Sequence, residues 1–181
     1  MQNLAAARAC FRAMGYTTNE FDKHMRDFTG AARRLEIIHE DVARNFVAFR
    51  DFAHAPSKLR ATQASVVNQF PNRKVTAVFE LHTYSSLSKS FIPQYSEAMN
   101  EVDHAIVYFD PSVVQHKRLE ELSPEFVKVS FARDNLEVFT KTNDLKRRLS
   151  KVPSENHVLL MMSSGRFGGV IFNPAPHPAT S

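Results

Sequence analysis

The sequence has little of what several protein classes require. It contains one cysteine, Cys10, which cannot form an internal disulfide, and only five glycines among 181 residues. These counts exclude a disulfide-stapled scaffold and a collagen-like chain. No apolar run approaches the roughly 18 residues that a membrane-spanning helix needs, and the N-terminus lacks the residue order of a signal peptide. We therefore expect a cytoplasmic protein with no membrane partner.

The composition is typical of a globular domain. Hydrophobic residues make up 43% of the chain and charged residues 23%, and Ile, Val, Leu and Phe are spread along its whole length. This distribution excludes low-complexity disorder, and the length predicts one full domain with room for an appendage. We find no internal repeat.

The charge balance is only mildly basic. Lys and Arg number 23 against 19 Asp and Glu, so the formal net charge is +4. A net charge this small does not indicate a polyanionic partner, and it is equally compatible with a bound nucleotide. The densest basic cluster, Lys146-Arg147-Arg148 with Lys151, lies at the end of an expected helix, where cations interact favourably with the helix terminus. We therefore expect no nucleic-acid partner.

Residues 1–30 have the spacing of two short helices. Apolar residues recur at helical intervals up to Gly15, and Thr18 is placed to cap a second run that continues to Gly30. Two helices this short rarely stand alone, and the first begins in an Ala-rich pattern without a capping residue. We expect them to be the end of a preceding domain. The apolar positions are Leu4, Ala7, Phe11, Met14, Phe21, Met25 and Phe28.

From Arg34 onward, short apolar runs alternate with amphipathic segments. The runs are apolar on both faces, as in the buried strands of a parallel sheet. The alternation predicts an α/β fold, Rossmann-like and doubly wound, with a mostly parallel sheet and flanking helices over residues 31–173, followed by a frayed tail at 174–181. The expected strands are 34–39, 46–52, 75–81, 105–109, 126–131, 158–162 and 170–172, and the expected helices are 57–70, 91–102 and 135–149.

In an open α/β sheet, ligands bind beyond the carboxyl ends of the strands. The first candidate there is the segment Asp51-Phe52-Ala53-His54-Ala55-Pro56. Pro56 suits the first position of a helix whose N-terminus can receive an anion, Asp51 can accept from ribose hydroxyls, and His54 can contact a base. The alternative is that Asp51 is a turn residue and His54 merely begins the helix.

The second candidate follows the most hydrophobic strand. The stretch from Glu80 to Lys89 offers an imidazole, several hydroxyls and an ammonium group, which can together orient a polar substrate. An ordinary surface loop is the alternative. A hydrolase triad is disfavoured because the sequence has no G-x-S-x-G motif.

The third candidate is Ser163-Ser164-Gly165-Arg166-Phe167-Gly168-Gly169. Its glycines permit close approach of a ligand to the backbone, and Arg166 can hold a carboxylate or phosphate with two hydrogen bonds. A tight turn before a last strand explains the segment nearly as well. The dispersed histidines and the single cysteine predict no structural metal site.

Taken together with Gly30-Ala31-Ala32-Arg33-Arg34-Leu35-Glu36, these segments resemble, in order and spacing, the C-terminal part of the Mur ligases. The resemblance covers almost the whole chain. The Ser-Ser-Gly-x-Phe and Asp-Phe-Ala-His-x-Pro segments are most similar to the murein peptide ligase branch, and Asp-x-Ala-His-x-Pro is similar also to folylpolyglutamate synthases.

The resemblance implies a division of labour among three domains. Such ligases have an N-terminal domain for the UDP-sugar, a central ATPase domain with the phosphate loop and Mg²⁺ ligands, and a C-terminal domain that closes over ATP and presents the incoming amine. This chain has no G-x-x-x-x-G-K-[ST] motif, so residues 1–30 are expected to be the last helices of the central domain, and the fragment alone to be inactive.

The family's reaction phosphorylates the carboxylate of UDP-N-acetylmuramate and lets the amine of a murein peptide, L-alanyl-γ-D-glutamyl-meso-diaminopimelate, displace the phosphate. The resemblance implies that the residues of this chain bind and orient the substrates rather than react covalently. It places Arg34, Asp51 and His54 at the nucleotide, and it places a larger set at the acceptor: His82, Tyr84, Ser85, Ser86, Lys89, Ser164, Gly165 and Arg166.

One departure from the family pattern concerns the acceptor. Alanine-adding relatives carry arginine after the histidine of this loop, whereas here Thr83-Tyr84-Ser85-Ser86 follows His82. Lys89 or Arg166 could substitute, although an ammonium does not reproduce a bidentate guanidinium. The alternatives are an L-alanine ligase, a folylpolyglutamate synthase domain, and a binding module without chemistry.

Overall fold

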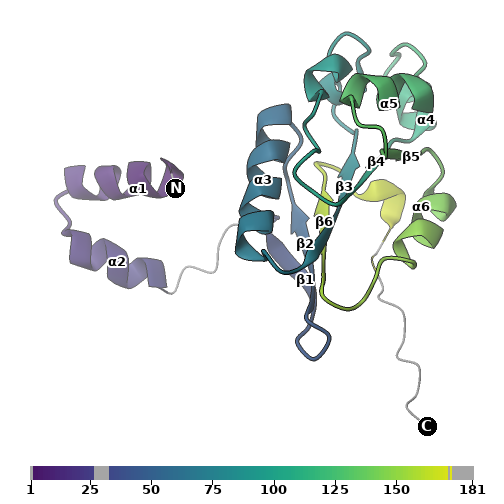
Figure 1. The fold of residues 1–181 in the computed structure, drawn as a ribbon. Coiled ribbons are helices and arrows are strands. Elements are labelled where there is room, and N and C mark those ends of the chain that lie inside the picture. Colours follow the sequence, from purple (N-terminus) through teal and green to yellow (C-terminus); the bar gives the residue numbers. More distant parts are fainter. Residues whose placement is uncertain (1, 27–32, 171, 173–181) are drawn as a thin grey trace. The chain divides into compact units, whose positions relative to one another are not determined.

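The computed structural model describes residues 2–26, 33–170 and 172, and these form two units (Figure 1). The first unit contains α1 (Gln2–Ala13) and α2 (Thr18–Arg26), as the spacing predicts. The chain turns between them at Gly15, whose φ of +91° favours glycine. Thr17, not Thr18, is the cap: it and Glu20 exchange side-chain-to-backbone hydrogen bonds. The expected continuation to Gly30 lies outside the described residues.

The second unit begins at Arg33 and is built on one six-stranded sheet of order β1-β2-β6-β3-β4-β5. β1 pairs antiparallel with β2, and every other pair is parallel, which confirms the mostly parallel α/β fold. The strands are β1 (Glu36–Asp41), β2 (Phe46–Asp51), β3 (Lys74–Glu80), β4 (His104–Tyr108), β5 (Glu137–Phe139) and β6 (His157–Met162).

The parallel strands end at one level. Asp51 of β2 is paired with Met162 of β6, and Glu80 of β3 with Tyr108 of β4. Because parallel strands point the same way, the residues that follow these four strands share one edge of the sheet. This edge holds the candidate segments after β2, β3 and β6.

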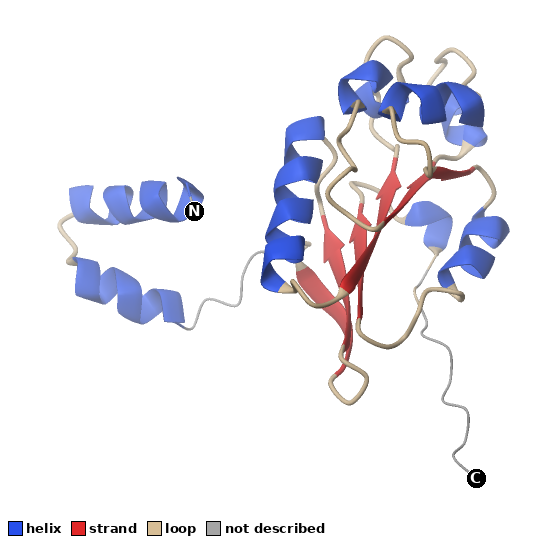
Figure 2. Ribbon diagram, viewed as in Figure 1, coloured by secondary structure: helices blue, strands red, loops and turns tan. Residues whose placement is uncertain are grey.

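Helices cover both faces of the sheet, with α3 and α6 on opposite sides (Figure 2). α3 (Pro56–Gln69) begins at Pro56 as expected and buries Leu59, Gln63 and Val66, which share one helical face. On the other face, Leu145 and Leu149 of α6 (Thr142–Leu149) pack against the strands. Two apolar cores therefore sandwich the sheet and hold its carboxyl edge rigid.

One expected strand is a helix. Residues 126–131 belong to α5 (Pro124–Phe131), because Ser123 accepts a hydrogen bond from the backbone N–H of Phe126 and Pro124 occupies the first turn. Val127 and Phe131, four residues apart, supply its buried stripe. A short apolar run does not distinguish strand from helix, whereas the Ser-Pro cap before it does.

The expected helix over 135–149 is also wrong in its first half. Glu137–Phe139 forms β5 beside β4, and α6 starts only at Thr142. The expected helix over 91–102 is a short 3₁₀ turn, η2 (Ile92–Tyr95), because the backbone leaves helical geometry at Ser96, whose ψ is 127°, and Glu97 has a φ of +59°. The first and last expected strands also differ from the observed elements.

β1 starts at Glu36 rather than Arg34 and runs antiparallel to the sheet. Val170 and Phe172 are outside any strand and follow the 3₁₀ turn η3 (Phe167–Gly169), while residue 171 and the expected tail lie outside the described residues. Sequence reasoning missed α4 (Pro111–His116), which Asp110 caps. No helix within the described ranges is long and apolar enough to cross a membrane.

A buried histidine makes stability depend on pH. Burial, with the neighbouring charge of His104, lowers the pKa of His157 to about 4. The unfolded chain, with a pKa near 6.5, binds this proton more readily, so the stabilisation is complete above about pH 6.5 and is lost as pH falls toward 4. Its ring bonds the hydroxyl of Thr76 at 2.8 Å.

We expect the free energy of unfolding to fall by about 2 kcal/mol between pH 7.5 and 5.0 through this residue. Denaturant titrations at both values, on the protein and on His157→Gln, measure it. The glutamine does not titrate, so the variant should show a smaller loss on acidification; equal losses would contradict the assignment.

Candidate functional site

A buried carboxylate ties together the loops at the carboxyl edge of the sheet. Glu80, the last residue of β3, is only 4% exposed. Its Oε2 accepts hydrogen bonds from the Ser163 hydroxyl and, at 2.8 Å, from the backbone N–H of Phe167. Its Oε1 lies 3.6 Å from Nδ1 of His82. One side chain therefore joins the segment after β6 to the histidine after β3.

Gly165 lies directly against this pair. A Cβ atom added there would lie 2.7 Å from Cγ of His82 and 2.8 Å from Oε2 of Glu80, closer than side chains pack. Ser163 also accepts from the backbone N–H of Gly165 at 2.7 Å. The second and third candidate segments thus meet, as the sequence predicts, and glycine is required by the closeness of His82.

The meeting point opens into a cleft of about 390 Å³. Its polar lining comes from three strand ends and from the segment that leads into β1. The Oγ atom of Ser164 is buried and has no hydrogen-bond partner among the described residues, so a ligand could supply one. The lining residues are Arg33, Glu80, His82, Asp110, Val113, Ser164, Gly165, Arg166 and Gly168.

The rest of the loop after β3 is partly engaged in its own structure. Ser86 is fully buried, and its hydroxyl accepts from the backbone N–H of His82 at 3.0 Å. Ser85 bonds the hydroxyl of Thr83, and Lys89 pairs with Glu120 at 3.4 Å. Tyr84 is exposed. Of the predicted acceptor residues, the structure brings His82, Ser164, Gly165 and Arg166 to the cleft.

The first candidate segment is organised by Asp51, which is 7% exposed. Its carboxylate accepts from the backbone N–H groups of Leu35, at 3.0 Å, and Ala53, at 2.7 Å, and from the hydroxyl of Thr62. Asp51 therefore joins the segment before β1 to the segment after β2. Its oxygens hold this chain's own backbone.

Arg34 and His54 flank Asp51. Arg34 is exposed and lies outside the cleft lining, whereas its neighbour Arg33 lines the cleft. Sequence reasoning gave no role to Arg33, because two adjacent arginines cannot be told apart without the backbone direction. The His54 ring bonds the carbonyl of Phe52 at 2.9 Å.

The described residues do not gather three His, Cys, Asp or Glu side chains in a metal-ligand arrangement.

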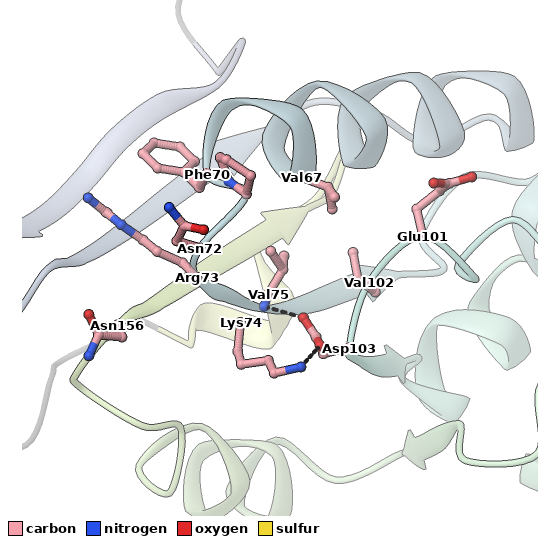
Figure 3. A pocket seen from close by; sticks show the side chains of 11 residues that line it. Val67, Phe70, Asn72, Arg73, Lys74, Val75, Glu101, Val102, Asp103 and Asn156 are labelled. Atoms are coloured by element: carbon pink, nitrogen blue, oxygen red, sulfur yellow. Dashed lines mark hydrogen bonds and ion pairs between the residues drawn. The ribbon is translucent and has the colours of Figure 1, made fainter.

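A second hollow, of about 520 Å³, lies at the opposite edge of the sheet (Figure 3). Asp103 bonds the ammonium of Lys74 at 2.6 Å and the backbone N–H of Val75 at 2.8 Å. Burial alone would raise the pKa of Asp103, but these two bonds, together with the charges of Lys74 and His104, outweigh it and lower the pKa. These interactions fix the start of β3, and none of the predicted site residues lines this hollow.

Comparisons with known proteins confirm the resemblance to the Mur ligases. Residues 33–165 match the family model for the Mur ligase, glutamate ligase domain. A UDP-N-acetylmuramate–L-alanine ligase of Thermotoga neapolitana is 29% identical over 165 residues, which cover 90% of this chain and 35% of that protein.

Two solved structures share the fold. The UDP-N-acetylmuramate–alanine ligase of Thermotoga maritima superposes with a TM-score of 0.69 at 22% identity, covering 92% of this chain and 34% of that one. The murein peptide ligase of Psychrobacter arcticus gives a TM-score of 0.65 at 18% identity, with the same coverage of 92% and 34%. The chain spans about a third of the length of these relatives.

Substitutions of Glu80 test its role in holding the edge. Glu80→Ala leaves the Ser163 hydroxyl and the Phe167 N–H without an acceptor, so we expect the free energy of unfolding to fall by about 2–3 kcal/mol. Glu80→Gln keeps an acceptor and should lose about 1 kcal/mol. Glu101→Ala, exposed at the opposite edge, is the control and should stay within about 0.5 kcal/mol.

The same variants test whether Glu80 determines which ring nitrogen of His82 carries the proton. A carboxylate opposite Nδ1 favours a proton on that nitrogen, whereas the amide of Glu80→Gln can donate and favours a proton on Nε2. Nitrogen NMR of the His82 ring should show this change of tautomer. An unchanged tautomer together with unchanged stability would show that Glu80 does not organise the cleft.

Proposed function

Because this chain belongs to the Mur ligase family, we propose that it is the C-terminal domain of an ATP-dependent ligase that joins UDP-N-acetylmuramate to a murein peptide. The observation that carries the proposal is the convergence on Glu80 of two loops, one after β3 and one after β6, at the carboxyl edge of a parallel sheet. The UDP-sugar site, the phosphate loop and the Mg²⁺ ligands belong, on this proposal, to other domains of the ligase.

The reaction needs two substrates to be brought together in sequence. The γ-phosphate of ATP passes to the muramate carboxylate, and the acceptor's amine attacks the resulting acyl phosphate. The C–N bond forms, the amine loses a proton, and inorganic phosphate leaves with the electrons of the C–O bond. The residues described here bind and orient the acceptor for this attack, which is a contribution of positioning rather than covalent catalysis.

The acceptor side of the proposal rests on the cleft residues. His82 presents its ring beside Gly165, the Ser164 hydroxyl lacks a partner among the described residues, and Arg166 is exposed at the rim. We assign these residues, together with Tyr84 and Ser85 from the same loop, to the acceptor. Lys89 and Ser86 support the loop through Glu120 and the backbone of His82.

The nucleotide side of the proposal rests on Asp51. By holding the backbone of Leu35 and Ala53, its carboxylate fixes the two segments that carry Arg34 and His54. We propose that these two side chains contact ATP and that Asp51 positions them.

A second candidate acceptor is free L-alanine, since the curated relative described above is an L-alanine ligase. The segment Thr83-Tyr84-Ser85-Ser86 argues against L-alanine, because it offers no guanidinium group to bind a small carboxylate. If the ligase uses neither acceptor in the test below, the remaining alternatives are a folylpolyglutamate synthase domain and a binding module without chemistry.

Competition between acceptors tests the proposed function. The full ligase that contains this domain is given ATP, Mg²⁺ and UDP-N-acetylmuramate with equal amounts of L-alanyl-γ-D-glutamyl-meso-diaminopimelate and L-alanine. We expect the tripeptide product to form at least about tenfold faster, because only the peptide fills an extended cleft. Preference for alanine would establish the second candidate, and no ligation would overturn both.

Kinetics of Arg34→Ala test the nucleotide assignment. In the full ligase we expect the KM for ATP to rise about tenfold while the KM for the acceptor changes less than about twofold, since a charge-assisted bond to ATP is lost. Arg73→Ala, at the opposite edge of the sheet, should change neither constant. A rise in the acceptor KM alone would contradict the assignment.

A further inference from the structure

Another hollow adjoins the cleft described above; we call the cleft the first lobe and this hollow the second lobe. It shares Arg33, Gly165 and Arg166 with the first lobe and extends, over about 390 Å³, toward β1 and the end of β2. There it gains the side chain of Arg50, which is exposed on the sheet face opposite α3. The two lobes are therefore neighbours, separated by no more than the residues that they share.

The second lobe is strongly cationic. Three arginines, Arg33, Arg50 and Arg166, line it, and no acidic residue does. Within the described ranges, none of the three guanidinium groups takes part in a hydrogen bond or an ion pair. The nearby Glu80 and Asp51 carboxylates already bind hydrogen-bond donors of this chain.

Two other arginines of the domain have structural partners. Arg148 donates hydrogen bonds to both carboxylate oxygens of Glu137. Arg133 donates to the backbone carbonyls of Met99, Val102 and Asp103. The three guanidinium groups at the second lobe have no such partner among the residues that the structure describes. Unpaired guanidinium groups around one hollow are suited to a carboxylate or a phosphate.

The remaining surface of the lobe is largely apolar. Met161 and Phe167 are each about 5% exposed or less, and Phe172 packs beside them. An apolar floor lowers the local dielectric constant and strengthens charge pairing above it. The lobe therefore fits an anionic group carried on a partly apolar stem.

The first lobe has a mixed character, because acids line it beside the two shared arginines. Its lining includes Glu80 and Asp110, the latter held by the backbone N–H of Ser112. A ligand that spans both lobes would place a positive charge near the acids and a negative charge near the arginines. A peptide that bears an amine at one end and carboxylates further along has this arrangement.

We propose that the second lobe binds a distal carboxylate of the acceptor and that Arg50 is the residue that selects a peptide over a single amino acid. The proposal rests on the proposed function, because it takes the first lobe as the acceptor site. Free L-alanine carries its only carboxylate next to its amine, so it cannot occupy both lobes. Arg50 acts by binding substrate and takes no part in bond making.

The experiment uses the full ligase and a series of tripeptides in which one carboxylate at a time is replaced by a carboxamide. Arg50→Met removes the charge and keeps an unbranched stem, Arg50→Lys keeps the charge without the fork, and Arg73→Met is the control. We expect Arg50→Met to raise the KM for the tripeptide about tenfold and to leave the KM for ATP unchanged. The KM of Arg50→Lys for the tripeptide should lie between those of the unmodified ligase and of Arg50→Met.

Combining the Arg50 variant with the carboxamide peptides identifies the carboxylate that contacts Arg50. One carboxamide peptide should bind the unmodified ligase about tenfold less well, and its KM should be unaffected by Arg50→Met, since the pair is already broken. An unchanged tripeptide KM in Arg50→Met would overturn this inference and leave the proposed function intact. A rise in the KM for ATP or UDP-N-acetylmuramate instead would assign the lobe to a phosphate and overturn it too. Failure of the unmodified ligase to use the tripeptide would overturn both.

Discussion

The buried carboxylate of Glu80 is the constraint on which the rest of the site depends. It stands at the end of the central strand β3, where desolvating a charge is unfavourable unless donors surround it. The chain supplies these donors from the segment after β6, through Ser163 and the backbone of Phe167. Satisfying one charge thus forces the glycine-rich segment to fold back over the sheet, and this fold-back brings His82 and Arg166 to one cleft.

Much of the fold can be predicted from the sequence. Strands β2, β3, β4 and β6 and the helix α3 lie within one or two residues of their expected positions, because each is a strong apolar run or stripe bounded by polar residues. The errors fall on short segments. A six-residue apolar run became α5 and a three-residue run became β5, since their state depends on a cap or on a neighbouring strand rather than on their own pattern.

The site is less predictable than the fold. The motifs identified the loops, and the register of the parallel strands then brought them together as expected. Which residues face the cleft depends on backbone direction and on hydrogen bonds between distant residues. The sequence marks Glu80 only as the start of a candidate loop; its organising role depends on Ser163, 83 positions later, which donates to it. Arg33 and Arg50 likewise carry no local signal, because only the fold places them around one hollow.

The two margins of the sheet have a consequence for the behaviour of the domain in a crowded cell. β1 is interrupted by a register shift between Ile37 and His39 and carries Glu36, Glu40 and Asp41, while β5 is only three residues long and is held by the pair of Glu137 with Arg148. Strands that are charged, irregular or very short are poor templates for backbone pairing with another chain. The folded domain can therefore present both margins of its sheet to solvent with little tendency to add a strand from a second copy.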